Sequence, residues 1–235
     1  MNSMIGLNEI KNSLLHFLFP KICSGCGSDL VSEETVLCMH CMADLPETNF
    51  EEHPGNPVEK LFRGRLPLVQ ATAQYYFTKE SLIQRLMHLF KYKSNKELGI
   101  QLGRMMGDSL KESGRYDIDA LIPLPLFPAK EKRRGYNQAA LLCEGIRESI
   151  PVPVLNNVVI RLQHTESQTK KGRIERWKNI EGKFELVNPG EIGKKHLLLV
   201  DDVITTGATL EACGAELLKG DNVRLSVAAL CLASH

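Results

Sequence analysis

Two neighbouring carboxylates and a threonine-rich loop around a glycine are the residues of this 235-residue chain best suited to chemistry. Asp201 and Asp202 directly follow an apolar run, and the sequence Thr-Thr-Gly-Ala-Thr comes at 205–209. The glycine lets backbone N–H groups approach an anion closely, and the threonine hydroxyls add further donors. Carboxylates repel a phosphate, but they accept hydrogen bonds from vicinal hydroxyls, as acidic residues do with ribose in dinucleotide-binding folds. The pattern therefore predicts a site for a phosphorylated sugar.

A buried strand and a helix are the elements that would position these groups. Residues 197–200 are continuously apolar, which is typical of a parallel strand buried on both faces, and we expect it to end at Asp201. A helical pattern follows at 210–219. Ligands of open α/β sheets lie at the carboxyl ends of strands, and a helix N-terminus attracts anions. No lysine follows the glycine, which excludes a nucleotide P-loop.

The segment 200–209, Val-Asp-Asp-Val-Ile-Thr-Thr-Gly-Ala-Thr, resembles the signature of type I phosphoribosyltransferases, which bind 5-phosphoribosyl-1-pyrophosphate (PRPP). The resemblance implies that Asp201 and Asp202 hold the 2- and 3-hydroxyls of the ribose. It also implies a loop that holds the 5-phosphate. The further residues that we assign to this PRPP site are Val203, Thr205, Thr206, Gly207, Ala208 and Thr209.

Four of the seven cysteines form two Cys-x-x-Cys pairs near the N-terminus, and they are Cys23, Cys26, Cys38 and Cys41. Two such pairs can supply the four thiolates of a closed, tetrahedral Zn2+ site of the structural kind. Disulfides and redox chemistry are the alternatives, but the sequence shows neither a secretory signal nor a thioredoxin-like βαβ pattern. His40 lies between better ligands, so we interpret it as a bystander. The spacing therefore predicts a zinc knuckle.

Composition and charge limit the remaining classes of function. The formal net charge of +1 demands no nucleic-acid partner for the chain as a whole. Residues 130–183 carry 12 Lys and Arg against 6 Asp and Glu, an excess that either faces a pyrophosphate or covers solvated helices and loops. No apolar run reaches 18 residues, so we expect no membrane span and a cytoplasmic protein. Apolar spacing at 5–19 predicts a short amphipathic helix for core packing, with membrane-surface binding as the lesser alternative.

The remaining pattern predicts an α/β fold, a parallel sheet flanked by helices. Strands are expected at 70–78, 120–124, 154–162, 195–200 and 223–232, and helices at 81–92, 95–112 and 137–149. A proline-stiffened loop is expected at 125–136 and a long polar loop at 163–183. The expected domains are an N-terminal helix and zinc knuckle at 1–50, a linker or cover at 51–68, and a phosphoribosyltransferase-like domain at 69–235.

Taken together, these motifs resemble the competence protein F (ComF) family of phosphoribosyltransferase-like proteins over essentially the whole chain. The resemblance rests on the cysteine module and on the segment Arg-Gly-Tyr-Asn-Gln at 134–138. It also rests on residues that precede the PRPP motif, namely Arg161, Thr165, Gln168, Arg176, Asn179 and Phe184. It implies a type I phosphoribosyltransferase core and a link to DNA uptake, and it leaves the acceptor undefined.

The expected activity is transfer of a phosphoribosyl group with release of pyrophosphate. Mg2+ would bridge the pyrophosphate and the ribose hydroxyls of PRPP. Four cations would stabilise the leaving pyrophosphate, and they are Lys130, Lys132, Arg133 and Arg134. Arg133 and Arg134 join Asp201 and Asp202 as the predicted catalytic residues. Two alternatives stay open: a PRPP sensor that transfers nothing, and a module that binds single-stranded DNA or a protein of the competence machinery.

Overall fold

The computed structural model describes residues 21–29, 32, 35–92, 95–162 and 184–233. The chain divides into two compact units, Met1–Leu45 and Pro46–His235, where we expected a boundary after residue 50. The predicted helix at 5–19 and the predicted loop at 163–183 lie outside the described residues. None of the described helices combines the length and apolar character needed to cross a bilayer.

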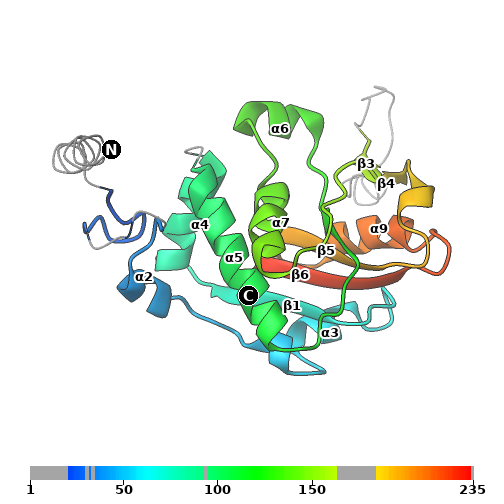
Figure 1. The fold of residues 1–235 in the computed structure, drawn as a ribbon, viewed down its shortest axis with the longest axis horizontal. Coiled ribbons are helices and arrows are strands. Elements are labelled where there is room, and N and C mark those ends of the chain that lie inside the picture. The colour runs from blue at the N-terminus through cyan, green and yellow to red at the C-terminus, as the bar shows by residue number, and fades with distance from the viewer. Residues whose placement is uncertain (1–20, 30–31, 33–34, 93–94, 163–183, 234–235) are drawn as a thin grey trace, which may run out of the picture. The chain divides into compact units, whose positions relative to one another are not determined.

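Four parallel strands form the sheet of the second unit, in the order β1-β6-β5-β2. Figure 1 labels the first three of these strands. Their bounds are Ala71–Phe77 for β1, Ala120–Pro123 for β2, His196–Ile204 for β5 and Arg224–Ala233 for β6. In the register of the sheet, Leu197 lies opposite both Leu225 of β6 and Ala120 of β2. The run 197–200 is completely buried, as its uninterrupted apolar character predicts. A parallel sheet flanked by helices is thus confirmed.

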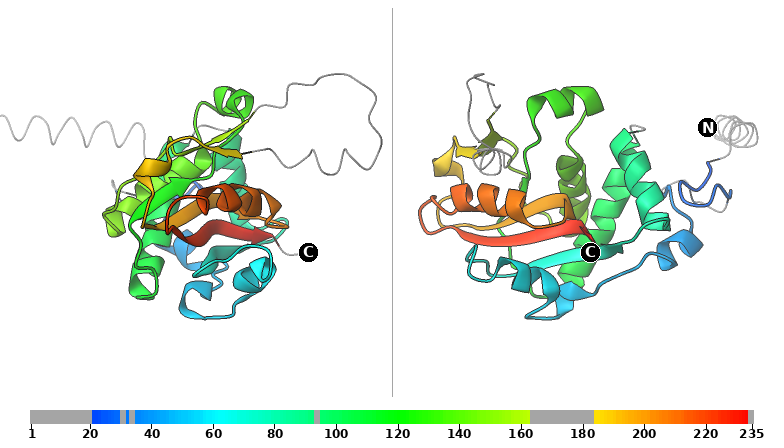
Figure 2. Two further views of the ribbon diagram at one scale, coloured as in Figure 1. Left: turned by 90° about the vertical axis from the view of Figure 1, so that its right-hand side faces the viewer. Right: turned by 180° about the vertical axis from the view of Figure 1, so that it is seen from behind.

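Helices cover both faces of this sheet. The longer helices are α4 (Leu82–Tyr92), α5 (Lys96–Glu112), α7 (Gln138–Ser149) and α9 (Ala208–Leu217). Figures 1 and 2 show α5 and α7 on one face and α9 on the other. The backbones of α5 and α7 lie so close that a Cβ at Gly103 would stand 2.3 Å from the Leu142 carbonyl oxygen. Glycine is therefore required at this crossing.

The segment 51–68, expected as a linker or cover, is folded into the second unit. It contains the 3-10 helix η1 (Phe50–Glu52) and the helix α3 (Pro57–Phe62). Asn56 starts α3, because its side chain accepts hydrogen bonds from the N–H groups of Val58 and Glu59. Val58 and Phe62 are fully buried in the same hydrophobic core as α9. These few apolar residues join the segment to the core that it shares with the sheet and with α9.

The segment 125–136 is not the continuous loop that we predicted, because it contains the helix α6 (Pro128–Arg134). Pro128 occupies the first helical turn, and Gly135 ends the helix in the left-handed conformation with φ 80°. Proline at the start and glycine just past the end are typical helix boundaries, and this signal was overlooked in the sequence. No residue of α6 is buried, so its cations stand on an exposed helix.

The predicted strand at 154–162 does not join the parallel sheet as a full strand. Only Val154 forms a bridge to Leu121, and β3 (Val159–Arg161) pairs instead with β4 (Phe184–Leu186) in an antiparallel ribbon. Pro151 and Pro153 lack the N–H groups that a longer ladder beside β2 would need. A second 3-10 helix, η2 (Pro189–Glu191), precedes β5.

Candidate functional site

A cavity of about 170 Å³ opens where β2 leaves the sheet and β5 continues. The ladder between these strands ends at Pro123 and Val200, and the N–H of Leu124 makes one further bond to the Val200 carbonyl, at 2.9 Å. β5 does not stop at the acids as predicted, because Asp201 still pairs with Ala229 of β6. Within the described residues, no strand pairs with the other flank of β5 beyond this point. The acids therefore project from a rigid strand into an opening at the carboxyl edge of the sheet.

Asp202 is paired with a lysine that sequence reasoning missed. The Nζ of Lys91, near the end of α4, lies 2.9 Å from Oδ2 of Asp202. Their side chains are only 23% and 17% exposed, so the attraction is weakly screened by solvent. Lys91 thus neutralises one of the two adjacent carboxylates. Nothing in the local spacing around Lys91 indicates this contact.

Asp201 carries the perturbed carboxyl of the pair. Burial, followed by the neighbouring charge of Asp202, raises the pKa of Asp201 to about 8, although Lys91 and Arg161 act in the opposite direction. One oxygen of Asp201 also accepts a hydrogen bond from the N–H of Asp202 at 2.7 Å. The two acids together therefore carry less than two negative charges near neutral pH, because Asp201 keeps its proton for most of the time. A ligand that brings cations or hydroxyl donors would favour the fully charged pair.

We expect Asp201→Asn to stabilise the protein near pH 8 and to have little effect near pH 4. The folded carboxyl keeps its proton up to about pH 8, whereas an unfolded Asp releases it near pH 3.9. The native state therefore binds more protons in this window, and the wild type loses stability as pH rises through it. In thermal unfolding from pH 4 to 8, the Tm of Asp201→Asn should rise increasingly above that of the wild type. Each kcal/mol of destabilisation that the substitution removes should raise the Tm by about 2–4 °C. Glu185→Gln, on the exposed face of β4, is the control, and a constant or falling difference would contradict the prediction.

Cations and amides form much of the remaining lining, beside Leu124, Leu126, Ala139 and Thr209. The Arg161 guanidinium of β3 lies 3.9 Å from the centre of the Phe127 ring and 5.2 Å from that of Phe184. Burial lowers the pKa of Arg161, and the charge of Asp201 opposes this change. Arg134, at the end of α6, lies 5.8 Å from the centre of the Tyr92 ring. Stacking on aromatic rings thus holds two guanidinium groups in the wall of the cavity.

The loop 205–207 is shaped by a glycine and by the neighbouring helix α3. Gly207 caps α9 with φ 74°, and a Cβ there would stand 2.9 Å from ring atoms of Phe62. Arg65 donates from Nη1 to the Thr206 carbonyl at 2.9 Å and also pairs with Glu211 in the first turn of α9. The segment 51–68 therefore supports this loop from behind. Thr205 and Thr206 are exposed residues, and the hydroxyl oxygen of Thr206 accepts a hydrogen bond from the Ala208 N–H at 3.4 Å.

The structure brings only part of the predicted site residues into the cavity lining. Those that line it are Lys130, Arg134, Asp201, Asp202 and Thr209. Those that do not are Lys132, Arg133, Val203, Thr205, Thr206, Gly207 and Ala208. Lys132 and Arg133 point to solvent from α6. The lining residues absent from the prediction include Lys91, Asn137, Gln138 and Arg161, of which the last three lie in segments that the family resemblance had marked.

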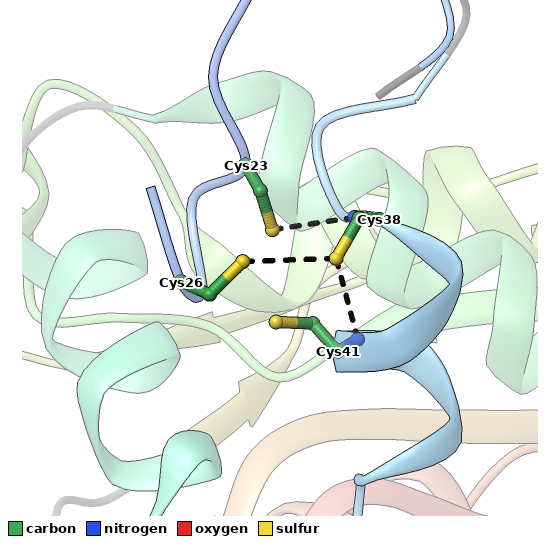
Figure 3. A group of neighbouring side chains, drawn as sticks. All are labelled: Cys23, Cys26, Cys38 and Cys41. Atoms are coloured by element: carbon green, nitrogen blue, oxygen red, sulfur yellow. Dashed lines mark hydrogen bonds between the residues drawn. The ribbon is translucent and has the colours of Figure 1, made fainter. Parts of the chain in front are cut away.

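The four cysteines of the first unit converge as their spacing predicts (Figure 3). Their four Sγ atoms all lie within 4.8 Å of one another, and Cys26 and Cys38 have Sγ atoms 3.7 Å apart. A tetrahedron with Zn–S bonds of about 2.3 Å has S–S edges of about 3.8 Å. Helix α2 (Met39–Ala43) begins beside Cys38 and places Cys41 in its first turn. All four are free thiols in the structure, so the cluster can hold a metal ion such as zinc.

Backbone N–H groups help this cluster to carry negative charge. The Sγ of Cys23 accepts hydrogen bonds from the N–H groups of Gly25 and Cys38, at 3.3 and 3.2 Å. Burial acts to raise the pKa of Cys23, but these N–H groups outweigh it and the pKa is lowered. Hydrogen bonds from Ser28 lower the pKa of Cys26 to about 6, whereas burial raises that of Cys41. A bound cation would remove this disparity by favouring all four thiolates.

The parallel sheet thus carries an acid pair near its carboxyl edge, with a glycine-capped helix after it, which is the order of elements that the sequence motif predicts. No family model matches the chain. Competence protein F of Haemophilus influenzae is 32% identical over 201 residues, which cover 83% of each chain. The DNA utilization protein YhgH of Salmonella typhimurium is 26% identical over 89% of each chain. The chain belongs to the competence protein F family.

Three further comparisons are weaker. Competence protein ComFC of Bacillus subtilis is 30% identical over 61% of this chain and 56% of its own. Among solved structures, an adenine phosphoribosyltransferase has a TM-score of 0.39 at 14% identity, over 62% of this chain and 74% of that one. The Bacillus subtilis glutamine PRPP amidotransferase has the same TM-score at 16% identity, over 60% and 30%. Family membership rests on the Haemophilus influenzae relative at 32% identity, since these structural similarities are low.

Proposed function

We propose that this protein binds PRPP with Mg2+ and transfers its phosphoribosyl group to an acceptor with release of pyrophosphate, in the service of DNA uptake. The observation that carries the proposal is the composition of one cavity: two adjacent carboxylates on β5 share it with four cations. A phosphorylated sugar diphosphate needs both, because its ring hydroxyls are donors and its phosphates are anions. The glycine-capped start of α9 lies directly beyond the acids in the chain.

Asp201 and Asp202 would accept hydrogen bonds from the ribose 2- and 3-hydroxyls. Their carboxylate oxygens are also the hard ligands that Mg2+ prefers, and Mg2+ characteristically keeps water and phosphate oxygens as its other ligands. The metal would supply charge neutralisation at the pyrophosphate. Arg134, Lys130 and Arg161 line the same cavity and would stabilise the negative charge that develops on the departing pyrophosphate.

The loop 205–209 would bind the 5-phosphate, and Arg65 would position that loop. Glu211 lies in the first turn of α9, where its charge would repel the phosphate if Arg65 did not neutralise it. We expect Arg65→Met to weaken the binding of ribose 5-phosphate roughly 5- to 10-fold, an effect of about 1 kcal/mol at a helix N-terminus. Adding Glu211→Gln should restore most of this affinity. Equal binding by Arg65→Met and the wild type, measured by calorimetry, would refute the role.

We further propose that the four cysteines bind Zn2+ for a structural purpose. Four thiolates complete the tetrahedral shell, so no position remains for a catalytic water. The knuckle therefore takes no part in phosphoribosyl transfer. Its contribution is to the folding of the first unit. The unfolded chain has no assembled site, so the free energy of binding the ion stabilises the folded state.

Titration calorimetry of the wild-type protein with PRPP, with and without Mg2+, tests the binding half of the proposal. Magnesium-dependent binding is the expected result, and no binding by the folded protein would overturn it. A pyrophosphate-release assay over a panel of nucleobases and amines tests the catalytic half. Binding without release on any acceptor would favour the non-catalytic PRPP sensor.

A nucleic-acid role is the second candidate, and the exposure of α6 favours it. Lys132 and Arg133 point to solvent and do not line the cavity, so they are available to phosphates of single-stranded DNA. Relatives named as DNA utilization proteins are consistent with such contacts. If α6 binds DNA, oligonucleotide affinity should fall steeply with salt, and Lys132→Gln with Arg133→Gln should flatten that dependence. Absence of binding at low salt would remove this candidate.

A further inference from the structure

A second cavity, of about 250 Å³, lies at the amino edge of the sheet, opposite the edge that carries the acid pair. Its lining comes from the ends of α5 and α7 and from the chain that enters β2 at Ala120. The two helices run in the same direction, since Gly103 of α5 lies against Leu142 of α7 and Gly107 lies against Ile146. Their C-termini therefore meet at this cavity.

The end of α7 leaves backbone carbonyls without backbone donors. Beyond the helix, the N–H groups of Ile150 and Val152 bond to other carbonyls, and Pro151 and Pro153 have no N–H to give. Within the part of the chain that the structure describes, the carbonyls of residues 147–149 thus receive no backbone hydrogen bond. Such acceptors stand at the negative end of the helix dipole, so they attract a donor that carries positive charge.

Two charged side chains of opposite sign line the same cavity without forming an ion pair. They are Lys111, in the last turn of α5, and Asp117, and both residues are exposed. Across the described segments, the ion pairs include neither of them, whereas the nearby Arg115 pairs with Glu59. A small ligand that carries both charges would satisfy the two side chains at once.

The rest of the lining is mainly apolar. Leu110 and Tyr116 are buried, and Ile150 and Pro151 follow the end of α7. Burial raises the pKa of the Tyr116 phenol, so its ring is neutral. The cavity is smaller than the about 300–1,000 Å³ typical of sites for drug-sized ligands. Its size and its lining therefore suit a small molecule with an apolar body and two opposite charges.

We propose that this cavity at the amino edge of the sheet binds a free, apolar α-amino acid. The ammonium group would lie at the end of α7 and beside Asp117, the carboxylate beside Lys111, and the side chain against Leu110 and Tyr116. No residue is shared with the cavity beside the acid pair, so the inference goes beyond the proposed function. The amino acid would be a second ligand, remote from the edge where the phosphorylated sugar is proposed to react.

Calorimetry of the wild-type protein with four probes tests each feature of the ligand. L-leucine has all three features, 4-methylpentanoate lacks the ammonium group, 3-methylbutylamine lacks the carboxylate, and glycine lacks the apolar side chain. L-leucine should bind at least about threefold more tightly than each of the others, because each omission removes one charged or apolar contact. No binding of L-leucine, or equal binding of any one of the other three, would overturn the proposal. No probe contains phosphate, so the result is independent of PRPP binding.

Lys111→Gln and Asp117→Asn test the two charged groups of the protein. Each should weaken L-leucine about 3- to 5-fold, the upper range for an exposed ion pair, while Lys111→Gln should not weaken 3-methylbutylamine. Lys60→Gln is the matched control, because Lys60 is also exposed in the last turn of a helix and lies outside the cavity lining. The Tm should stay at its wild-type value in all three variants, since the residues are exposed. Full L-leucine affinity in both cavity variants, or an equal loss in Lys60→Gln, would overturn the proposal.

Discussion

Replacing both acids, Asp201→Asn with Asp202→Asn, is expected to weaken PRPP binding at least about 100-fold, because two hydrogen bonds to charged groups are lost together. The variant also loses the carboxylate oxygens that would attract Mg2+. Calorimetry in the presence of Mg2+ measures the effect directly. The same experiment without the metal should show a smaller difference between variant and wild type.

Loss of folding would not account for the effect of Asp201, because the buried Asp201 carboxyl opposes stability in the free protein near pH 8. Asp201 keeps its proton up to about pH 8 through burial and the charge of Asp202. The double variant removes this repulsion, although it also leaves Lys91 without its partner. Asp201→Asn alone should therefore combine reduced affinity with a higher Tm at pH 8. Retention of full PRPP affinity by the double variant would place the ligand elsewhere.

Removing the metal is expected to unfold the cysteine module while the second unit stays folded. The four thiols all lie between residues 23 and 41, whereas the cavity lining lies entirely in the second unit. Metal-binding energies of small knuckles are on the order of 10 kcal/mol, which exceeds what so small a core supplies. Chelation or Cys38→Ser should therefore cause loss of structure in the first unit and leave PRPP affinity unchanged.

Thiol counting provides the measurement. The zinc-loaded protein should protect its thiols, the chelated protein should expose four, and the denatured chain should expose all seven. The remaining three, Cys143, Cys213 and Cys231, are fully buried in the second unit. His40→Ala is the control, since His40 is exposed and should not affect zinc content. Release of all seven thiols on chelation would show that the second unit depends on the metal.

The sequence by itself predicted several helices and strands and the cysteine cluster. Apolar periodicity located β1, α4, α5, α7 and the apolar start of β5 to within about two residues. The cysteine spacing predicted a cluster that the structure brings together. The helices form their hydrogen bonds within a few residues, and the buried strands are marked by apolar runs, so in both cases the pattern of residue types was sufficient.

The tertiary structure decided which distant groups meet at the site. Lys91 reaches Asp202 only because α4 and β5 are brought to one edge of the sheet, and Arg161 lines the cavity because β3 pairs with β4 instead of joining that sheet. Arg65 supports the loop at Thr206 because α3 packs with α9 in one core. Such contacts depend on strand order and on the packing of elements far apart in the chain. No local periodicity encodes them, which is why the acids were predicted from the sequence and their partners were found only in the fold.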